Sequence, residues 1–143
     1  MPWALATLLA GFGLLLAWSL SGTSGHASNA ATSAFGLEGV VWKLEGGTVD
    51  DGLIDPSPWS TLTLEVQGGT VSGEVGCNQY GGPWVVDGDE VEVGDIAISL
   101  AMCSRSSEVE GAFLTGLTRV DRVRRSGHQL ILSGPDVELR LNG

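Results

Sequence analysis

Residues 73–82 read GEVGCNQYGG, and the interpretation of the whole chain depends on them. They follow an alternating run of apolar and polar residues that is typical of a β-strand. Cys77, Asn78 and Tyr80 then stand between glycines. A thiol beside an amide and a phenol would suit a reactive site, and it would equally suit a tight corner that holds half of a disulfide. The first interpretation indicates an enzyme, and the second indicates a small binding or structural domain.

The N-terminus indicates export. The run Trp3–Leu20 is apolar nearly throughout and holds no charged side chain, and small and polar residues follow it. This order is typical of a secretory signal, and we expect cleavage after Ala27, with Ala30 as a second site. The apolar run also approaches the length of a membrane-spanning helix, so an uncleaved anchor is the alternative.

Export bears on the two cysteines of the chain, Cys77 and Cys103. In an oxidising compartment an even pair in a small domain most simply forms a disulfide. Two cysteines and His128, the histidine that remains after signal removal, are too few for a structural zinc site with its four ligands. A reactive Cys77 with His128 as its base is the weaker alternative, because a base also needs an orienting partner.

Length and charge bound the organisation and the partners. The 143 residues suffice for one modest domain, and 17 acidic against 7 basic residues give a net charge of −10. Nucleic acid is excluded as a partner, because its phosphates require a basic face. We expect a signal peptide or anchor at 1–27, a linker at 28–36 and one domain at 37–143.

The domain is expected to be mainly β. A first short strand is predicted at 40–46, and a loop rich in Gly, Asp and Pro at 46–58. Leu62, Leu64 and Val66 share one face of the next strand. Further strands are predicted at 70–75, 83–86, 90–100, 121–127, 128–134 and 137–143, which makes about eight in all.

One segment, 106–120, has the period of a helix. Val109, Phe113, Leu117 and Val120 form its apolar stripe, and Ser107 with Glu110 forms a capping box at its start. Because two glycines weaken this helix, its stripe must dock on the sheet. We therefore predict a curled antiparallel sheet or small β-barrel that a helix plugs or flanks.

Several motifs in this order resemble the META/HslJ domain family, the family of heat-shock protein HslJ. The resemblance covers about 105 residues, and it rests on Trp42-x-Leu44, on Gly76-Cys77-Asn78-x-Tyr80-x-Gly82, on Met102-Cys103 and on a helix with Phe113 and Leu117. One departure is Ser99-Leu100, where many members have a threonine before the cysteine segment. The resemblance implies a small antiparallel β-barrel-like domain in the cell envelope or secreted, in some members tied to stress. It carries over no catalytic residues.

The resemblance also places the corner at Cys77 beside the segment at Cys103, and we predict a disulfide between them. Gly76, Gly81 and Gly82 are expected to let the chain turn sharply. Asn78 is expected to bond to nearby backbone, and Tyr80 to offer its ring to the core and its hydroxyl to a partner. The corner is therefore interpreted as a structural clasp.

The charged and aromatic clusters elsewhere in the chain are interpreted as structural. The acidic run is expected to be a solvated outer face of a hairpin instead of a calcium site; it comprises Asp87, Asp89, Glu90, Glu92 and Asp95. A basic cluster follows the helix and comprises Arg119, Arg122, Arg124 and Arg125. The positive charge of Arg119 is expected to offset the helix dipole, and an anion site in the cluster is the alternative. Trp42, Trp59 and Trp84 are expected in the core or at its rim.

The predicted function is that of a non-catalytic, exported domain of the bacterial cell envelope, secreted or periplasmic, with a stress-related role. A carrier of a small apolar ligand inside the barrel is the alternative. We expect no catalytic, cofactor or metal site. The expected partner is an unidentified envelope component or a small apolar ligand, and the membrane is contacted only through an uncleaved N-terminal segment.

Overall fold

The computed structural model describes residues 36–56, 60–101 and 108–143. In these ranges the chain forms ten strands and one helix. In chain order they are β1 (Trp42–Val49), β2 (Gly52–Ile54), β3 (Thr63–Gln67), β4 (Thr70–Val75), β5 (Asn78–Asp87), β6 (Glu90–Val93), β7 (Ala97–Ile98), α2 (Glu108–Leu117), β8 (Arg122–Ser126), β9 (Gln129–Gly134) and β10 (Val137–Asn142).

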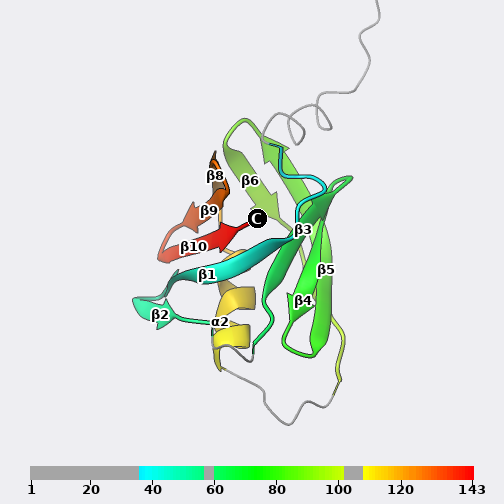
Figure 1. Cartoon of the computed structure of the whole chain (residues 1–143), viewed down its shortest axis with the longest axis vertical. Coiled ribbons are helices and arrows are strands. Elements are labelled where there is room, and N and C mark those ends of the chain that lie inside the picture. Colours follow the sequence, from blue (N-terminus) through cyan, green and yellow to red (C-terminus); the bar gives the residue numbers. More distant parts are fainter. Residues whose placement is uncertain (1–35, 57–59, 102–107) are drawn as a thin grey trace, which may run out of the picture.

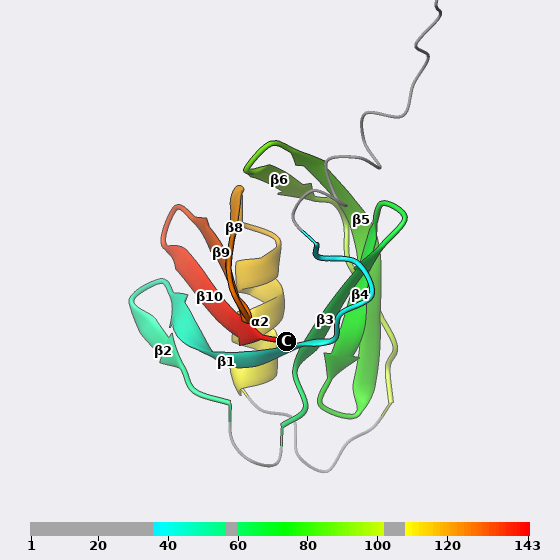
Figure 2. The same ribbon diagram turned by 45° about the horizontal axis from the view of Figure 1, so that its top comes forward.

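Eight of the strands close into an antiparallel barrel. The ladder runs from β1 through β3, β4, β5, β6, β8 and β9 to β10, which pairs with β1 and completes the ring. Two short strands lie outside this ring, because β2 pairs with β1 and β7 pairs with β5. Both views show α2 between the side formed by β8, β9 and β10 and the side formed by β3, β4 and β5 (Figures 1 and 2). The predicted small antiparallel barrel with one helix is confirmed.

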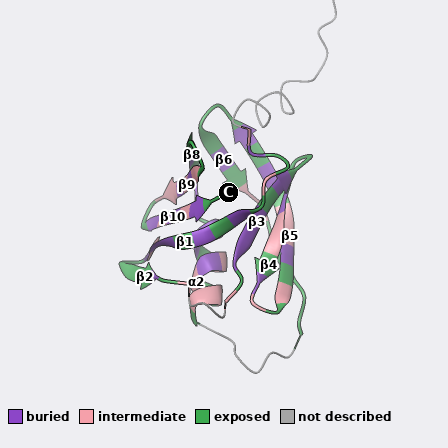
Figure 3. Ribbon diagram, viewed as in Figure 1, coloured by how far each residue is buried: buried purple, intermediate pink, exposed green. Residues whose placement is uncertain are grey.

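The core follows the alternation of the strands (Figure 3). Leu62, Leu64 and Val66 are all buried, as the period of two predicts. From the helix, Phe113 and Leu117 are fully buried, and the Phe113 ring meets the Tyr80 ring edge-on with centroids 5.8 Å apart. The apolar stripe of the helix is thus docked as predicted.

The helix is shorter than the predicted range. It ends at Leu117, and Val120 is buried beyond its end. Ser107 lies outside the described residues, so the capping box stays a prediction.

The predicted loop at 46–58 is wrong in its first half. β1 continues to Val49 and returns through a turn at Asp50 and Asp51 into β2. Gly47 is required because β1 and β10 approach each other closely, not because the chain forms a loop. A Cβ at this position would overlap the backbone carbonyl of Glu138 on β10. Pairing of β1 with β10, far away in the sequence, thus keeps this glycine-rich stretch extended.

The seam between β6 and β8 is the shortest contact in the ring. The two strands share one residue pair, Glu90 with Arg122. Beside it, Val91 N donates to Asp121 O at 3.0 Å, and Val123 N donates to Asp89 O at 2.8 Å. Beyond this point the chain leaves β6 at Val93 and rejoins the sheet through β7 on β5.

The chain enters the barrel through residues that close one of its ends. Leu37 is fully buried, and its carbonyl accepts a hydrogen bond from Trp42 Nε1 at 3.3 Å. The Arg125 guanidinium donates to the carbonyl of Gly36 and lies over the Trp42 ring, 5.2 Å from its centroid.

The predicted signal and both cleavage sites, after Ala27 and Ala30, lie outside the described residues. Among the residues that are described, no helix is long and apolar enough to cross a membrane.

Candidate functional site

The corner that holds the cysteine is a tight turn between β4 and β5. Gly76 has a φ of 63°, in the left-handed region that glycine adopts without strain. A Cβ at this position would also overlap the side-chain carboxylate of Glu110, which α2 brings against the turn. The turn predicted at Gly76 is confirmed, and the approach of the helix is a second reason for the glycine.

Asn78 ties this corner to a distant segment. Its Oδ1 accepts hydrogen bonds from Ala101 N at 2.7 Å and from Ser99 Oγ at 3.0 Å. The Ser99 hydroxyl also accepts from Gln79 N at 2.9 Å. These two partners are not the local backbone of the turn, because they come from more than 20 residues further along the chain. Ser99 keeps the hydroxyl that a threonine would supply at this position.

Gly81 and Gly82 do not form a turn. Both lie inside β5, paired with β4. A Cβ on Gly82 would lie 2.8 Å from Asp95 O and 2.9 Å from Ile96 Cδ1. Glycine is needed here because the chain after β6 packs onto β5, which local sequence does not reveal.

Tyr80 replaces part of the ladder between β3 and β4. Its hydroxyl donates to Thr63 O at 2.6 Å, while Thr63 Oγ1 accepts from Glu74 N at 2.9 Å. Gly73, the partner of Tyr80 across β4 and β5, has no side chain, and a Cβ there would overlap the Thr63 carbonyl. The predicted roles of the ring and the hydroxyl are confirmed. The part of Thr63 was not foreseen, because nothing in its local pattern distinguishes it from other strand threonines.

Burial raises the pKa of Tyr80 far above its usual value near 10, and the negative charge of Glu65 adds to the effect. The unfolded chain therefore loses this proton near pH 10, while the folded chain keeps it to higher pH. Above about pH 10 the unfolded state binds fewer protons, so stability should fall by about 1.4 kcal/mol per pH unit.

Tyr80→Phe tests this linkage. The variant should lose about 1–3 kcal/mol at neutral pH, because the buried Thr63 carbonyl loses its donor. It should also lose the part of the alkaline slope that belongs to the phenol. Denaturant unfolding between about pH 8 and pH 11.5 measures both. Tyr80 is the single tyrosine of the chain, so phenolate absorbance reports it alone. Phenolate absorbance that appears near pH 10 while the protein is folded would contradict the buried assignment.

Met102 and Cys103 lie outside the described residues, so the disulfide stays a prediction. The residues on either side of that stretch both reach the corner. Ala101 is held by Asn78, the neighbour of Cys77, and Glu110 lies against Gly76. Residues on both sides of the stretch that contains Cys103 thus lie at the corner, which is compatible with the short Cα separation of a disulfide.

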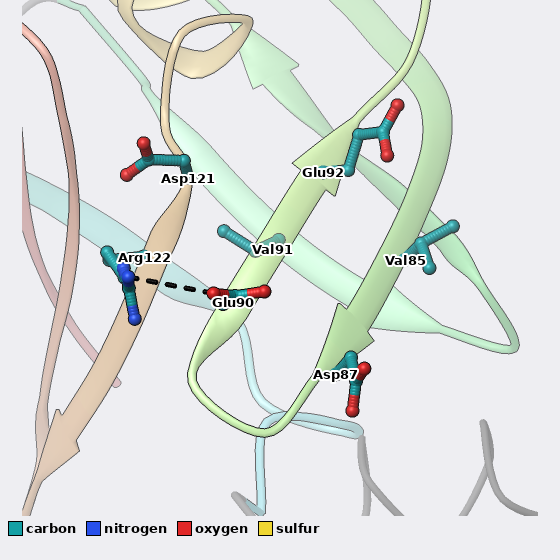
Figure 4. Close-up of a pocket in the computed structure, with 7 residues that line it drawn as sticks. All are labelled: Val85, Asp87, Glu90, Val91, Glu92, Asp121 and Arg122. Atoms are coloured by element: carbon teal, nitrogen blue, oxygen red, sulfur yellow. Dashed lines mark ion pairs between the residues drawn. The ribbon is translucent and has the colours of Figure 1, made fainter.

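An acid-walled hollow lies on the outer face of the barrel, across the seam. Its volume is about 340 Å³, and it is lined by Val85, Asp87, Glu90, Val91, Glu92, Asp121 and Arg122. Figure 4 shows four carboxylates in this lining, those of Asp87, Glu90, Glu92 and Asp121, and the ion pair that joins Arg122 to Glu90 across the seam. The two paired atoms are 3.6 Å apart. Arg122 also contacts Asp89 at 3.2 Å.

The acidic run lies on the exposed surface, as predicted for the outer face of a hairpin. Among the described residues no group of three or more His, Cys, Asp or Glu could hold a metal ion.

The basic cluster is not assembled into one site. Arg119 lies past the end of α2 and pairs with Asp50 at 2.6 Å, while Arg122 pairs across the seam. Arg125 is engaged with Trp42 and Gly36 at the end of the barrel. The tryptophans agree with a core role, since Trp42 and Trp84 are both buried; Trp59 lies outside the described residues.

The sequence matches the META domain family over residues 18–141. Among solved structures, the fold is similar to the NMR structure of a protein from Burkholderia xenovorans, with 26% identity, a TM-score of 0.61, and coverage of 83% of this chain and 90% of that chain. It is also similar to the crystal structure of a DUF4847 family protein from Bacteroides vulgatus, with 12% identity, a TM-score of 0.54, and coverage of 78% of this chain and 95% of that chain. The second likeness concerns the fold alone. No curated protein matches the chain.

Proposed function

This chain belongs to the META domain family, and on that premise we propose that it is a non-catalytic, exported domain of the bacterial cell envelope with a stress-related role. The non-catalytic part of the proposal rests on one observation: the residues of the family motif make structural contacts within the fold. The polar groups of Asn78 and Tyr80 form hydrogen bonds with Ser99, Ala101 and Thr63. Gly76 and Gly82 make room for other parts of the chain. Each of these residues thus has a structural reason to be present.

The packed interior supports this role over that of a carrier. A carrier of a small apolar ligand needs room inside the barrel. The interior positions hold large, fully buried side chains from strands and helix alike, among them Trp42, Trp84, Phe113, Leu117 and Leu139. The hollow of Figure 4 lies on the outer face of the barrel.

Export is tested by N-terminal sequencing of the protein from its host. The apolar N-terminal run and the small residues after it support cleavage, so the mature chain should begin near Ser28 or Ala31. A protein that still begins at Met1 and sediments with membranes would show an anchor. A protein that stays in the cytoplasm would contradict the proposal.

The stress role is tested by survival of a deletion strain after heat shock. The strain should survive less well than its parent, and the intact gene should restore survival. A gene without codons 2–27 is the matched control, because its product lacks the predicted export signal and should not restore survival. Equal survival of deletion strain and parent would sink the stress role.

The non-catalytic part is tested with Asn78→Ala. The variant loses the acceptor that holds Ser99 and Ala101, so it should be less stable. At a growth temperature where it stays folded, it should restore survival as well as the intact gene does. A folded variant that fails to do so would reopen the interpretation of the corner as a reactive site.

A further inference from the structure

A second depression lies between the helix and the strands that follow the seam. It has a volume of about 570 Å³. One wall comes from the stretch 92–98 and the other from α2 and the residue after it; the lining includes Glu92, Asp95, Ile96, Ile98, Leu114 and Thr118. We call this depression the seam groove. It shares Glu92 with the acid-walled hollow of Figure 4, so the two depressions adjoin at this residue.

The seam groove runs along an open edge of the sheet. β7 pairs with β5 and, among the described strands, with no other. β6 meets β8 at the single pair Glu90 and Arg122, which lies before the groove begins. The end of β6 at Glu92 and Val93 and the free side of the two-residue β7 therefore face a helix instead of a neighbouring strand. An open edge can accept an extended segment from another chain by backbone hydrogen bonds.

Apolar side chains are exposed along this edge. Ile98 is 40% exposed, and Leu100, two residues further on, is 93% exposed. Ile96 and Leu114 are partly buried against the core and form the floor between the two walls. Val85, in the adjoining hollow, is 58% exposed. Two of the large apolar side chains that the described surface exposes, Ile98 and Val85, thus line adjoining depressions, which marks an interaction site better than scattered single residues do.

The rim of the depression is acidic. Glu92 and Asp95 border the seam groove, and Asp87, Glu90 and Asp121 border the hollow. The one basic side chain in these two linings, Arg122, is already paired with Asp89 and Glu90. The chain as a whole carries a net charge of −10, which adds to the negative potential at the rim.

We propose that the seam groove binds an extended segment of a partner protein in which apolar and basic side chains alternate. The backbone of the segment pairs with the open edge at β7. Its apolar side chains fill the groove over Ile96, Ile98 and Leu114, and its basic side chains meet Glu92 and Asp95. A period of two in the partner matches this arrangement, because alternate residues of a strand point to opposite faces.

The charges favour this occupant over a second copy of the chain. Two copies joined at this edge would bring Glu92 and Asp95 of one close to those of the other, and like charges across an interface oppose association. A basic segment instead gains from the same carboxylates. The proposal goes beyond the envelope role and is independent of whether the N-terminal segment is cleaved.

The probe is a seven-residue peptide, acetylated and amidated, of sequence Arg-Val-Lys-Ile-Arg-Val-Lys. It is titrated into the ¹⁵N-labelled exported protein at low ionic strength and followed by NMR. Saturable shifts are expected at the amides of Ile96, Ile98, Leu114 and Thr118. The same peptide with Glu at every basic position should not bind, and methylation of alternate peptide nitrogens should weaken binding about tenfold or more, because it removes edge hydrogen bonds.

Matched variants separate the groove from general charge attraction. Glu92→Lys with Asp95→Asn should weaken binding about tenfold or more, whereas Glu45→Lys with Asp51→Asn, which makes the same change in net charge outside both linings, should change it less than about threefold. Ile98→Ser should weaken binding, and Leu53→Ser, on the exposed β2, should not.

Three results would overturn the proposal. The first is no saturable binding of the basic peptide. The second is equal weakening by the groove variants and their controls, which would mean that net charge alone attracts the peptide. The third is a concentration-dependent dimer that Ile98→Ser abolishes, which would make a second copy the occupant of the groove.

Discussion

Phe113→Ala is expected to lower the free energy of unfolding by about 3–5 kcal/mol, the range for removing a buried phenylalanine. Phe113 is fully buried on the docked face of α2, and its ring packs edge-on against Tyr80. Removing the ring leaves a cavity between the helix and the barrel, and the closed ring of strands limits how far the surroundings can collapse into it. Denaturant unfolding, compared with the unchanged chain, measures the loss.

Thr115→Ala is the matched control for the helix. Thr115 lies on the exposed side of α2, and alanine is the stronger helix former, so the variant should stay within about 0.5 kcal/mol of the unchanged chain. Similar losses for the two variants would mean that the helix contributes through its own formation instead of through its docked face.

Loss of the predicted disulfide between Cys77 and Cys103 is expected to cost about 3–4 kcal/mol in the chain-entropy model. For a domain of this size that corresponds to a fall of roughly 10–20 °C in the midpoint of thermal unfolding. The barrel should still form, because its closure depends on strand pairing and on the buried core. Thermal unfolding with and without reductant measures the fall, and circular dichroism reports whether the fold persists.

The control is the double variant Cys77→Ser with Cys103→Ser, whose midpoint should not respond to reductant. Thiol titration of the unfolded, unreduced protein should find no free thiol. Two free thiols, or a midpoint that reduction leaves unchanged, would contradict the predicted disulfide. Cys77 would then again be a candidate reactive group.

The faces of the strands could be predicted from the sequence alone. Alternation placed Leu62, Leu64 and Val66 in the core, and all three are buried. The spacing of Phe113 and Leu117 likewise predicted the docked face of the helix. These signals are local, because the side-chain period of a strand or a helix is set by its own backbone geometry.

The candidate site could be predicted only in part. Cys77, Asn78 and Tyr80 were located as the informative residues, and the ring and hydroxyl of Tyr80 have the roles expected of them. The partner of Asn78 was missed, since it is held by hydrogen bonds to residues that only the folded barrel brings near. The seam groove was missed for the same reason, because its two walls come from separate segments of the chain.

The sequence by itself determined which side chains face inward and which segment is helical. Only the tertiary structure explains why glycine is required at some positions inside strands. Gly47 and Gly82 look like loop residues in isolation, yet both lie in strands. Each position requires glycine because a neighbouring residue, Glu138 or Ile96, occupies the space that a side chain would need. The tertiary structure also decided that β1 pairs with β10 and that the pairing in the ring is shortest between β6 and β8. Periodicity is a property of a short segment, whereas strand pairing and close approach join residues far apart in the chain, so only the closed barrel could reveal them.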